Sequence, residues 1–167
     1  MPTTNSDVKL DTFNRRILET LHLHADLTNQ ELADRVGLSP SACHQRVKQL
    51  KEGGYMFNFH CEMDLDRICE HVLAYVEFTL ASNTPEARAR FEAAIDAIPE
   101  FMDCLRLGDE ADYISFTCAR DLNRLNALCD TLSGDEKAGV NRVRVRVILD
   151  RAKFYLGYPL AQLKWRD

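Results

Sequence analysis

Polar residues with the spacing of one helix face follow Pro40. Ser41, His44 and Lys48 recur three or four residues apart, which puts their side chains on the same side of a helix. On such a face Gln45 can offer a paired donor and acceptor to adenine, whereas lysine and arginine side chains suit phosphates. The segment therefore predicts contact with double-stranded DNA. The candidate residues are Ser39, Ser41, His44, Gln45, Arg46, Lys48, Gln49 and Lys51.

The distribution of charge favours a DNA contact confined to one small face, although the net charge is −5. Residues 1–60 hold seven Lys or Arg and seven Asp or Glu, whereas residues 61–167 hold fourteen and nineteen. Within Ser39–Gly53, three cationic side chains stand against Glu52 alone. A locally basic element on an acidic body suits a protein that touches DNA at one place. The alternative for each cationic residue is a merely solvated helix face.

Capping and turn residues predict that this face belongs to the last helix of a helix-turn-helix. Thr28 and Glu31 form a capping box at the start of the second helix. Gly37 ends that helix in a left-handed conformation, Ser39 caps the next helix, and Pro40 occupies its first position. The alternative is a helical hairpin within another all-α unit. The apolar stripes of the three helices are Ile17, Leu18 and Leu21, then Leu32, Ala33 and Val36, then Cys43, Val47 and Leu50.

The rest of the chain has the element order of a ferredoxin-like domain. Helices begin at the N-cap residues Thr84 and Asp121, and strands are expected at His71–Leu80, Phe101–Leu107, Tyr113–Cys118 and Val143–Leu149. Both helices should cover one face of an antiparallel sheet. The fold class is therefore α+β: a winged-type helix-turn-helix followed by a ferredoxin-like βαββαβ domain. The expected inward residues are Val72, Ala74, Val76, Phe78, Leu80, Phe91, Ala94, Ile95, Ile98, Leu122, Leu125, Leu128, Leu132, Val143, Val145, Val147 and Leu149.

The face of the sheet away from the helices needs water, a ligand or a second sheet to cover it. Leu73, Tyr75 and Ile148 fall on this face and favour a partner subunit. We expect one arginine of the last strand to pair there with Glu77 on a neighbouring strand, the alternative being a solvated basic stripe. The arginines that alternate on this face are Arg142, Arg144 and Arg146.

Length and composition are those of a globular protein with two small domains. The expected division is a DNA-binding domain at 1–54, a linker strand at 55–70, and an assembly and effector domain at 71–167. No apolar run approaches the ~18 residues of a membrane span, and residues 1–7 lack the features of a signal peptide, so we expect a cytoplasmic protein. The six cysteines form no C-x-x-C pair, so we expect buried free thiols, no metal site and no cofactor.

These features together resemble the Lrp/AsnC family, the feast/famine regulators. The resemblance runs from Leu10 to Leu160, and its most specific part is Val36-Gly37-Leu38-Ser39-Pro40 followed by Cys43 and Arg46-Val47. It implies a transcription regulator with a C-terminal domain of the RAM/AsnC type, a homo-oligomer that dimerises through its sheets and assembles further, up to octamers. Further matches are Leu10-Asp11, Arg16-Ile17-Leu18, Glu31-Leu32-Ala33, Leu50, Ala111-Asp112-Tyr113, Gly139-Val140 and Pro159-Leu160.

The resemblance also implies a small-molecule effector, an amino acid or a similar compound, bound between dimers near the hairpin that joins the two middle strands. Backbone groups in such a turn can hold a carboxylate, and Asp112 can hold an ammonium group. The alternative for Asp112 is a turn residue that caps its own backbone. The candidate effector residues are Leu107, Gly108, Asp109, Asp112 and Tyr113.

This chain departs from the family pattern in the hairpin, the last strand and the linker. Asp109 stands where a glycine is usual, and Val143 and Val145 stand where threonines are usual. The linker sequence Tyr55-Met56-Phe57-Asn58 lacks the usual Ile-x-Gly-Tyr pattern. The effector pocket is therefore expected to have lost hydroxyl groups and gained a carboxylate. The alternatives to an ordinary neutral amino acid are a cationic effector, a larger one, or none.

Three other functions compete with that of an effector-responsive regulator. A ligand-independent local repressor or architectural protein would bind and bend DNA without a small-molecule switch. A protein-interaction module would keep the third helix without using it on DNA. A sirohaem-decarboxylase-like enzyme would reuse the same fold for catalysis. We expect no enzyme, because no acid–base grouping is evident among His22, His24, His60 and His71.

Overall fold

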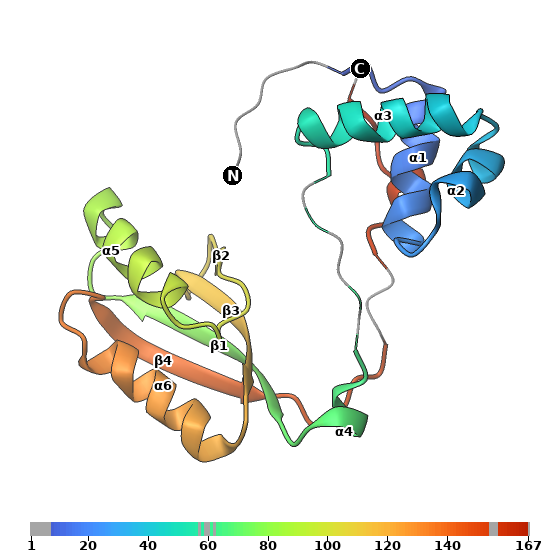
Figure 1. The fold of residues 1–167 in the computed structure, drawn as a ribbon. Helices are drawn as coiled ribbons and strands as arrows, with labels where there is room; N and C mark the ends of the chain where they lie inside the picture. The colour runs from blue at the N-terminus through green and yellow to red at the C-terminus, as the bar shows by residue number, and fades with distance from the viewer. Residues whose placement is uncertain (1–7, 57, 59–60, 62, 154–156, 167) are drawn as a thin grey trace. The chain divides into compact units, whose positions relative to one another are not determined.

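The computed structural model describes residues 8–56, 58, 61, 63–153 and 157–166. The chain forms two compact units (Figure 1). The helix-turn-helix unit comprises Met1–Met63 and Lys153–Asp167, and the sheet unit comprises Asp64–Ala152.

Three helices build the helix-turn-helix unit: α1 (Thr12–Leu23), α2 (Asn29–Val36) and α3 (Pro40–Glu52) (Figure 1). They pack around one apolar cluster, to which all three predicted stripes contribute. Leu18 and Val47 are half-buried at its margin. The buried members are Ile17, Leu21, Leu32, Ala33, Val36, Cys43 and Leu50.

The predicted caps of α2 and α3 are confirmed. The Thr28 hydroxyl accepts a hydrogen bond from the Glu31 N–H, and the Glu31 carboxylate accepts one from the Thr28 N–H at 2.8 Å. Gly37 follows α2 with φ of 75°, in the left-handed region that glycine adopts without strain. Ser39 caps α3 and Pro40 is its first residue. These local interactions fix the turn between the two helices.

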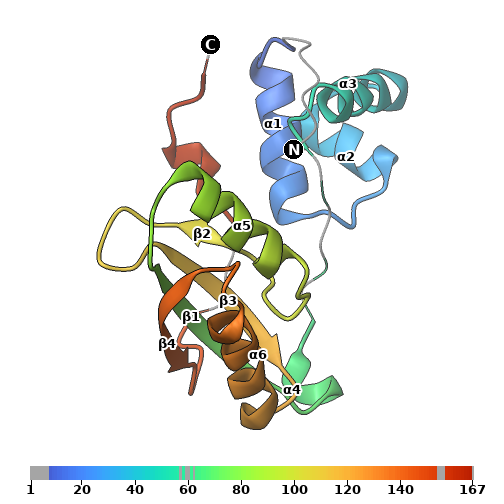
Figure 2. The same cartoon turned by 90° about the vertical axis from the view of Figure 1, so that its left-hand side faces the viewer.

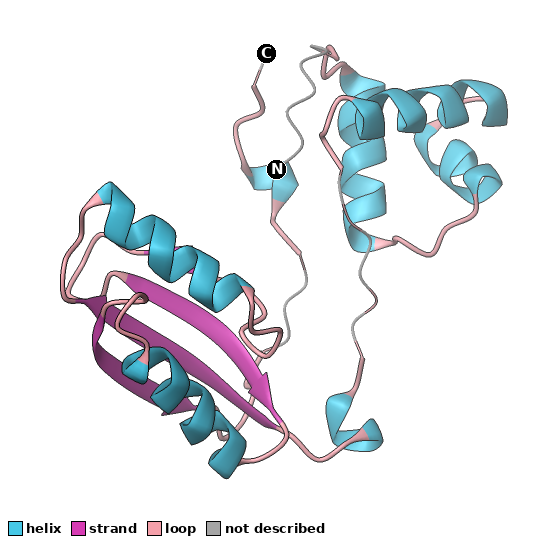
Figure 3. Ribbon diagram, turned by 60° about the vertical axis from the view of Figure 1, so that its left-hand side comes forward, coloured by secondary structure: helices cyan, strands magenta, loops and turns pink. Residues whose placement is uncertain are grey.

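The sheet unit has the predicted order of strands and helices. Its elements are β1 (Val72–Leu80), α5 (Pro85–Asp96), β2 (Leu105–Arg106), β3 (Tyr113–Ala119), α6 (Leu122–Gly134) and β4 (Val140–Val147). The strands lie in the order β2-β3-β1-β4, and every pairing is antiparallel. Both α5 and α6 cover the same face of the sheet, and no helix of the sheet unit's described residues covers the opposite face (Figures 2 and 3). The ferredoxin-like arrangement is thus confirmed.

The core of the sheet unit lies between the sheet and its two helices. Val76 and Phe78 of β1 are fully buried there, against Phe91 of α5 and Leu125 of α6. Three residues that were predicted to face the core are exposed in the structure. Leu122, the first residue of α6, is 53% exposed. Val147, the last residue of β4, is 42% exposed, and Leu149 beyond it is 94% exposed.

The strand predicted at Phe101–Leu107 is shorter in the structure. Only Leu105 and Arg106 pair regularly with β3, and Phe101 forms an isolated bridge with Thr117. Between them the Asp103 carboxylate accepts a hydrogen bond from the Phe116 N–H at 2.7 Å. A side chain therefore takes the place of a backbone partner, and the regular ladder is interrupted.

The segments that join the two units differ from the expected linker and domain boundary. The predicted strand at 55–70 includes residues 57, 59, 60 and 62, which lie outside the described part, and Leu65–Ile68 of the same range forms the short helix α4. Lys153–Asp167 groups with the helix-turn-helix unit, whereas the sequence placed these residues in the C-terminal domain. Within this segment Leu160–Gln162 forms a 3-10 turn.

Two further expectations concern cysteines and membranes. None of the six cysteines forms a disulfide bond, but only Cys43 and Cys129 are buried. Cys61 and Cys69 are exposed, so the expectation of buried thiols was wrong for them. In the described ranges we find no cluster of His, Cys, Asp or Glu suited to a metal ion. The helices of these ranges are also too short or too polar to span a bilayer.

Replacing Gly37 by alanine tests the turn between α2 and α3. An alanine held at positive φ is strained by about 1–2 kcal/mol, so thermal unfolding of Gly37→Ala should occur at a lower temperature than in the wild type. Gly134→Ala is the control, because a Cβ there meets no atom within 4 Å and no positive φ is required. Equal melting temperatures for wild type and Gly37→Ala would contradict the assigned turn.

Candidate functional site

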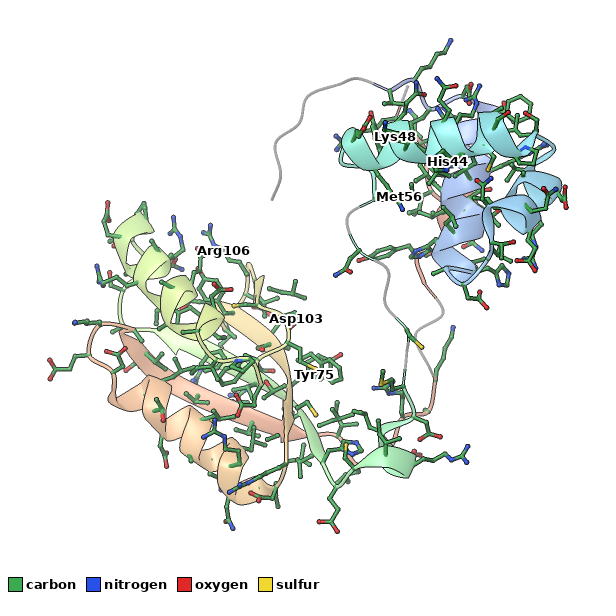
Figure 4. The ribbon with its side chains drawn as sticks, in the orientation of Figure 1. His44, Lys48, Met56, Tyr75, Asp103 and Arg106 are labelled. Carbon is green, nitrogen blue, oxygen red and sulfur yellow. The ribbon has the colours of Figure 1, made fainter. Side chains whose placement is uncertain are left out.

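A row of polar side chains lies on the exposed side of α3. Ser41, His44, Gln45 and Lys48 are all exposed, and Figure 4 marks His44 and Lys48 on this helix. Gln49 and Lys51, from the same predicted set, are also exposed. The fixed turn and the buried stripe of α3 hold this row on a rigid element. The geometry suits insertion of the helix into a groove of DNA.

Arg46 is separated from this row by its own contacts. Its Nη1 donates to the two carboxylate oxygens of Asp11, at 3.0 and 2.9 Å, and to the side-chain oxygen of Asn14 at 3.0 Å. Its guanidinium also lies over the ring of Phe13, 5.4 Å from the centroid. The structure therefore places half-buried Arg46 in the contact between α3 and α1. Likewise the Ser39 hydroxyl is engaged as the N-cap of α3.

The Asp11 carboxylate is the centre of this contact. It also accepts a hydrogen bond from the Asn14 N–H at 2.9 Å, which caps α1. That N–H and the neighbouring Arg46 lower the pKa of Asp11 from its ordinary value of 3.8, while partial burial opposes them. The same carboxylate thus caps α1 and holds α3, so the orientation of the exposed row depends on Asp11 being ionised.

A cavity of about 150 Å³ lies on the uncovered face of the sheet, beside the β2–β3 hairpin. It contains two of the predicted effector residues, Leu107 and Asp109. The others come from β1, β4 and the hairpin, and most of them are charged. The complete lining is Glu77, Thr79, Leu107, Asp109, Glu110, Ala111, Arg142, Arg144 and Arg146.

Ion pairs link the charged residues of this cavity. Glu77 lies 2.6 Å from Arg146 and 3.5 Å from Arg144, so the predicted pairing of Glu77 with the arginine stripe is confirmed. Glu110 of the hairpin lies 2.9 Å from Arg142 and 3.8 Å from Arg144. Its hydrogen bond with Arg142 and the charges of Arg142 and Arg144 lower the pKa of Glu110. The cavity therefore holds carboxyl and guanidinium groups side by side.

Two other predicted effector residues have structural partners elsewhere. The Asp112 carboxylate accepts hydrogen bonds from the Leu80 N–H at 2.7 Å and from the Asn83 side chain, which holds the loop after β1. Tyr113 is 1% exposed and points to the helix-covered side, where its hydroxyl donates to Glu92 at 2.6 Å. Burial and this carboxylate raise the pKa of Tyr113 to about 12. Neither residue lines the cavity, and Gly108 does not line it either.

Val143 and Val145 also lie away from the cavity. Both pack against the core on the helix-covered side of β4. The expectation that these valines remove hydroxyl groups from the pocket was therefore wrong, because side chains alternate along a strand. The intervening residues Arg142 and Arg144 are the ones that reach the cavity.

Most of the cavity lining was not among the predicted effector residues: the sequence missed Glu77, Thr79, Glu110, Ala111, Arg142, Arg144 and Arg146. Thr79 is two residues from Glu77 on β1 and therefore shares its face, a signal that alternation alone provides. Glu110 lies within the predicted hairpin but offered no sign that it would face the arginines.

The four histidines considered for catalysis are not brought together within the described residues. His22 and His24 belong to the helix-turn-helix unit and His71 to the sheet unit, while His60 lies outside the described residues.

Two family models match the chain. A model described as winged helix-turn-helix DNA-binding matches residues 10–55, which include α1, α2 and α3. A model described as the Lrp/AsnC ligand binding domain matches residues 73–156, which include the sheet except for Val72, the helices α5 and α6, and the lining of the cavity.

Similar proteins cover most of this chain. The leucine-responsive regulatory proteins of Escherichia coli K12 and Haemophilus influenzae are each 30% identical to it, over 86% of this chain and 87% and 86% of their own lengths. A transcriptional regulator from Neisseria meningitidis, solved in complex with L-Met, matches with a TM-score of 0.80 at 29% identity, over 91% of this chain and 97% of that one. The Mycobacterium tuberculosis leucine response regulatory protein matches with a TM-score of 0.75 at 25% identity, over 87% and 96%.

Acid unfolding tests the contact around Asp11. Because the folded state lowers the pKa of Asp11, its contribution to stability is present above the ordinary value of 3.8 and is lost as the pH falls through the lowered value. Asp11→Asn should be less stable than wild type at neutral pH, and this difference should shrink in acid. The melting temperature measured across a pH series checks this. Arg46→Gln keeps the hydrogen bond from the Asn14 N–H to Asp11, so its melting temperatures should lie between those of the wild type and Asp11→Asn. A difference between Asp11→Asn and the wild type that is constant with pH would contradict the assignment.

Proposed function

Since this chain belongs to the Lrp/AsnC family of DNA-binding transcription regulators, we propose how its two units perform that function. The exposed row of α3 binds double-stranded DNA in the major groove, and the cavity beside the β2–β3 hairpin binds a small-molecule effector. The observation that carries the first assignment is the exposed row itself, held on a helix whose opposite side is packed and clamped to α1.

Within the row, the side chains divide by the groups they suit. Gln45 reads a base edge, because its amide offers a donor and an acceptor together. Lys48 binds phosphate as a point charge; its contact with Glu52 at 3.8 Å is between two exposed groups and so is weak enough to yield. Ser41 and His44 lie nearer the start of α3, where a recognition helix approaches the bases. Arg46 supports the row by fixing the helix.

For the effector we propose an amino acid or a similar zwitterion. The regulator from Neisseria meningitidis was solved with L-Met, and this chain matches it over both units. In the cavity, Arg142 suits a carboxylate, and the carboxylates of Asp109 and Glu110 suit an ammonium group. A volume of about 150 Å³ admits a molecule of that size. Binding requires that Glu110 release Arg142, which costs little because exposed ion pairs contribute roughly 0–1 kcal/mol.

The uncovered face of the sheet supports assembly into dimers. Tyr75 is 44% exposed on this face, and its ring packs against Phe116 of β3, 5.2 Å between centroids. The remaining apolar residue of β1 on this face is Leu73, beside Ile148. A second sheet would remove these side chains from water, as the hydrophobic effect favours. The regulator would act on DNA in the cytoplasm, as homodimers or larger assemblies.

A ligand-independent repressor or architectural protein is the second candidate. The observation that favours it is the charge balance of the cavity, where Glu77 and Glu110 already engage the three arginines. A cavity whose charges are satisfied by its own side chains can serve as a structural network. The two candidates differ in whether a small molecule changes the affinity for DNA.

Paired substitutions test the recognition helix. Lys48→Ala should weaken binding to all DNA sequences and reduce the salt dependence by about one unit of slope, because one phosphate contact is lost. Gln45→Ala should instead alter the sequence preference. Both are measured by titrating selected genomic fragments and random duplexes at several salt concentrations. Glu19→Ala, a substitution on α1, serves as the control. Wild-type behaviour of both variants would defeat the assignment of α3.

Substitution of Arg142 tests the effector site. Arg142→Gln should lower the affinity for L-Met or L-Leu, whichever the wild type binds, by about tenfold or more, since a charge-assisted hydrogen bond is lost. Isothermal titration calorimetry measures this. Arg90→Gln is the matched control, because Arg90 lies on α5 and donates to the Lys137 carbonyl. Unchanged affinity in Arg142→Gln would overturn the proposed site, and a wild type that binds no amino acid would favour the ligand-independent candidate.

A further inference from the structure

The C-terminal segment, residues 157–166, packs on α1. The Tyr158 N–H donates to Nε2 of His22 at 2.5 Å, and the rings of the two residues stack with 5.5 Å between centroids and 6° between planes. Seven residues earlier on the same helix, the guanidinium of Arg15 lies over the ring of Trp165, 5.7 Å from its centroid. Residues near both ends of the segment therefore contact α1, two turns apart.

Gly157 makes the close approach to His22 possible. Its φ is +90°, and a Cβ at this position would lie 2.6 Å from Nε2 of His22 and 2.9 Å from the adjacent ring carbon. A side chain would therefore be strained by the backbone and would also displace the ring. The segment and the helix are fitted to each other at this one residue.

The docked segment leaves the core of the unit untouched. The face of α1 that packs against α2 and α3 carries Ile17 and Leu21, whereas the segment contacts Arg15 and His22. Tyr158 is largely exposed despite its contacts. Detaching the segment should thus leave the three-helix fold intact.

The contact of this segment with α1 adds to the connection that the chain makes between the two units. The segments that connect them leave the sheet unit from neighbouring strands, before β1 and after β4, where the Ile148 N–H donates to the Leu73 carbonyl at 2.8 Å. One segment leads back to the end of α3, and the other leads to the contact on α1. The helix-turn-helix unit is therefore attached to the sheet unit at two points.

We propose that residues 157–166 form a strap that restricts the orientation of the helix-turn-helix unit and thereby raises its affinity for DNA. A unit held by a single connection must lose more orientational freedom when several copies bind one DNA molecule together, and that loss opposes binding. The strap removes part of this freedom beforehand. It is held on α1 by the hydrogen bond from the Tyr158 N–H to Nε2 of His22.

The test uses Gly157→Ala and His22→Ala in the full chain. Trp165 is the single tryptophan of the protein, so quenching of its fluorescence by acrylamide reports directly whether the strap is docked. Affinity is measured on the same samples with a long random-sequence duplex at several salt concentrations. Gly139→Ala is the matched control, because Gly139 has φ of +65° but a Cβ there meets no atom within 4 Å.

Both variants should show stronger quenching of Trp165 and about tenfold weaker binding to the duplex, with an unchanged salt slope because the phosphate contacts are the same. The control should match the wild type in the affinity for DNA and in quenching. Unchanged quenching in both variants would show that the segment does not dock on α1. Stronger quenching without a loss of affinity would overturn the role of the strap in DNA binding, while leaving the recognition helix unaffected.

Discussion

In both units, the element that carries the side chains of the proposed site is packed against the core of its own unit on one side only. Helix α3 buries Cys43 and Leu50 in the three-helix core, and strand β4 packs Val143 and Val145 against the core under its two helices. Helical and strand periodicity then direct the intervening polar residues outward. The exposed row of α3 and the arginine stripe of β4 therefore follow from how these elements are packed. A rigid, one-sided element is what both DNA reading and ligand binding require.

The sequence predicted most of the fold, because the signals are local. The capping box of Thr28 and Glu31, the left-handed Gly37 and the Ser39 cap each act within four residues, and the comparisons with known proteins confirm the resulting family assignment. Long-range partners escaped prediction. Arg46 looked like a phosphate ligand, but its partner Asp11 lies 35 residues away in sequence.

The proposed effector site was likewise predictable where the signal was local and not where it depended on residues distant in sequence. The alternation of side chains along the strands predicted that Glu77 and the arginines share one face of the sheet. The ion pairs of Glu77 with Arg144 and Arg146 agree with that prediction. The assignment of Val143 and Val145 to the pocket came from family positions and ignored that alternation. The docking of the C-terminal segment on α1 had no sequence signal, because it depends on one glycine fitting against a histidine 135 residues away. Contacts of this kind are specified by shape rather than by pattern.

The most direct test of the whole account is the binding of the wild-type protein to fragments of genomic DNA, over a range of salt concentrations and with and without a panel of amino acids. We expect that a small subset of fragments is retained, that affinity falls steeply as salt rises, and that at least one amino acid changes the retention. If fragments are retained selectively but no amino acid changes their retention, the ligand-independent regulator is the favoured function. Absence of any retained fragment at low salt would contradict the central claim that α3 reads DNA.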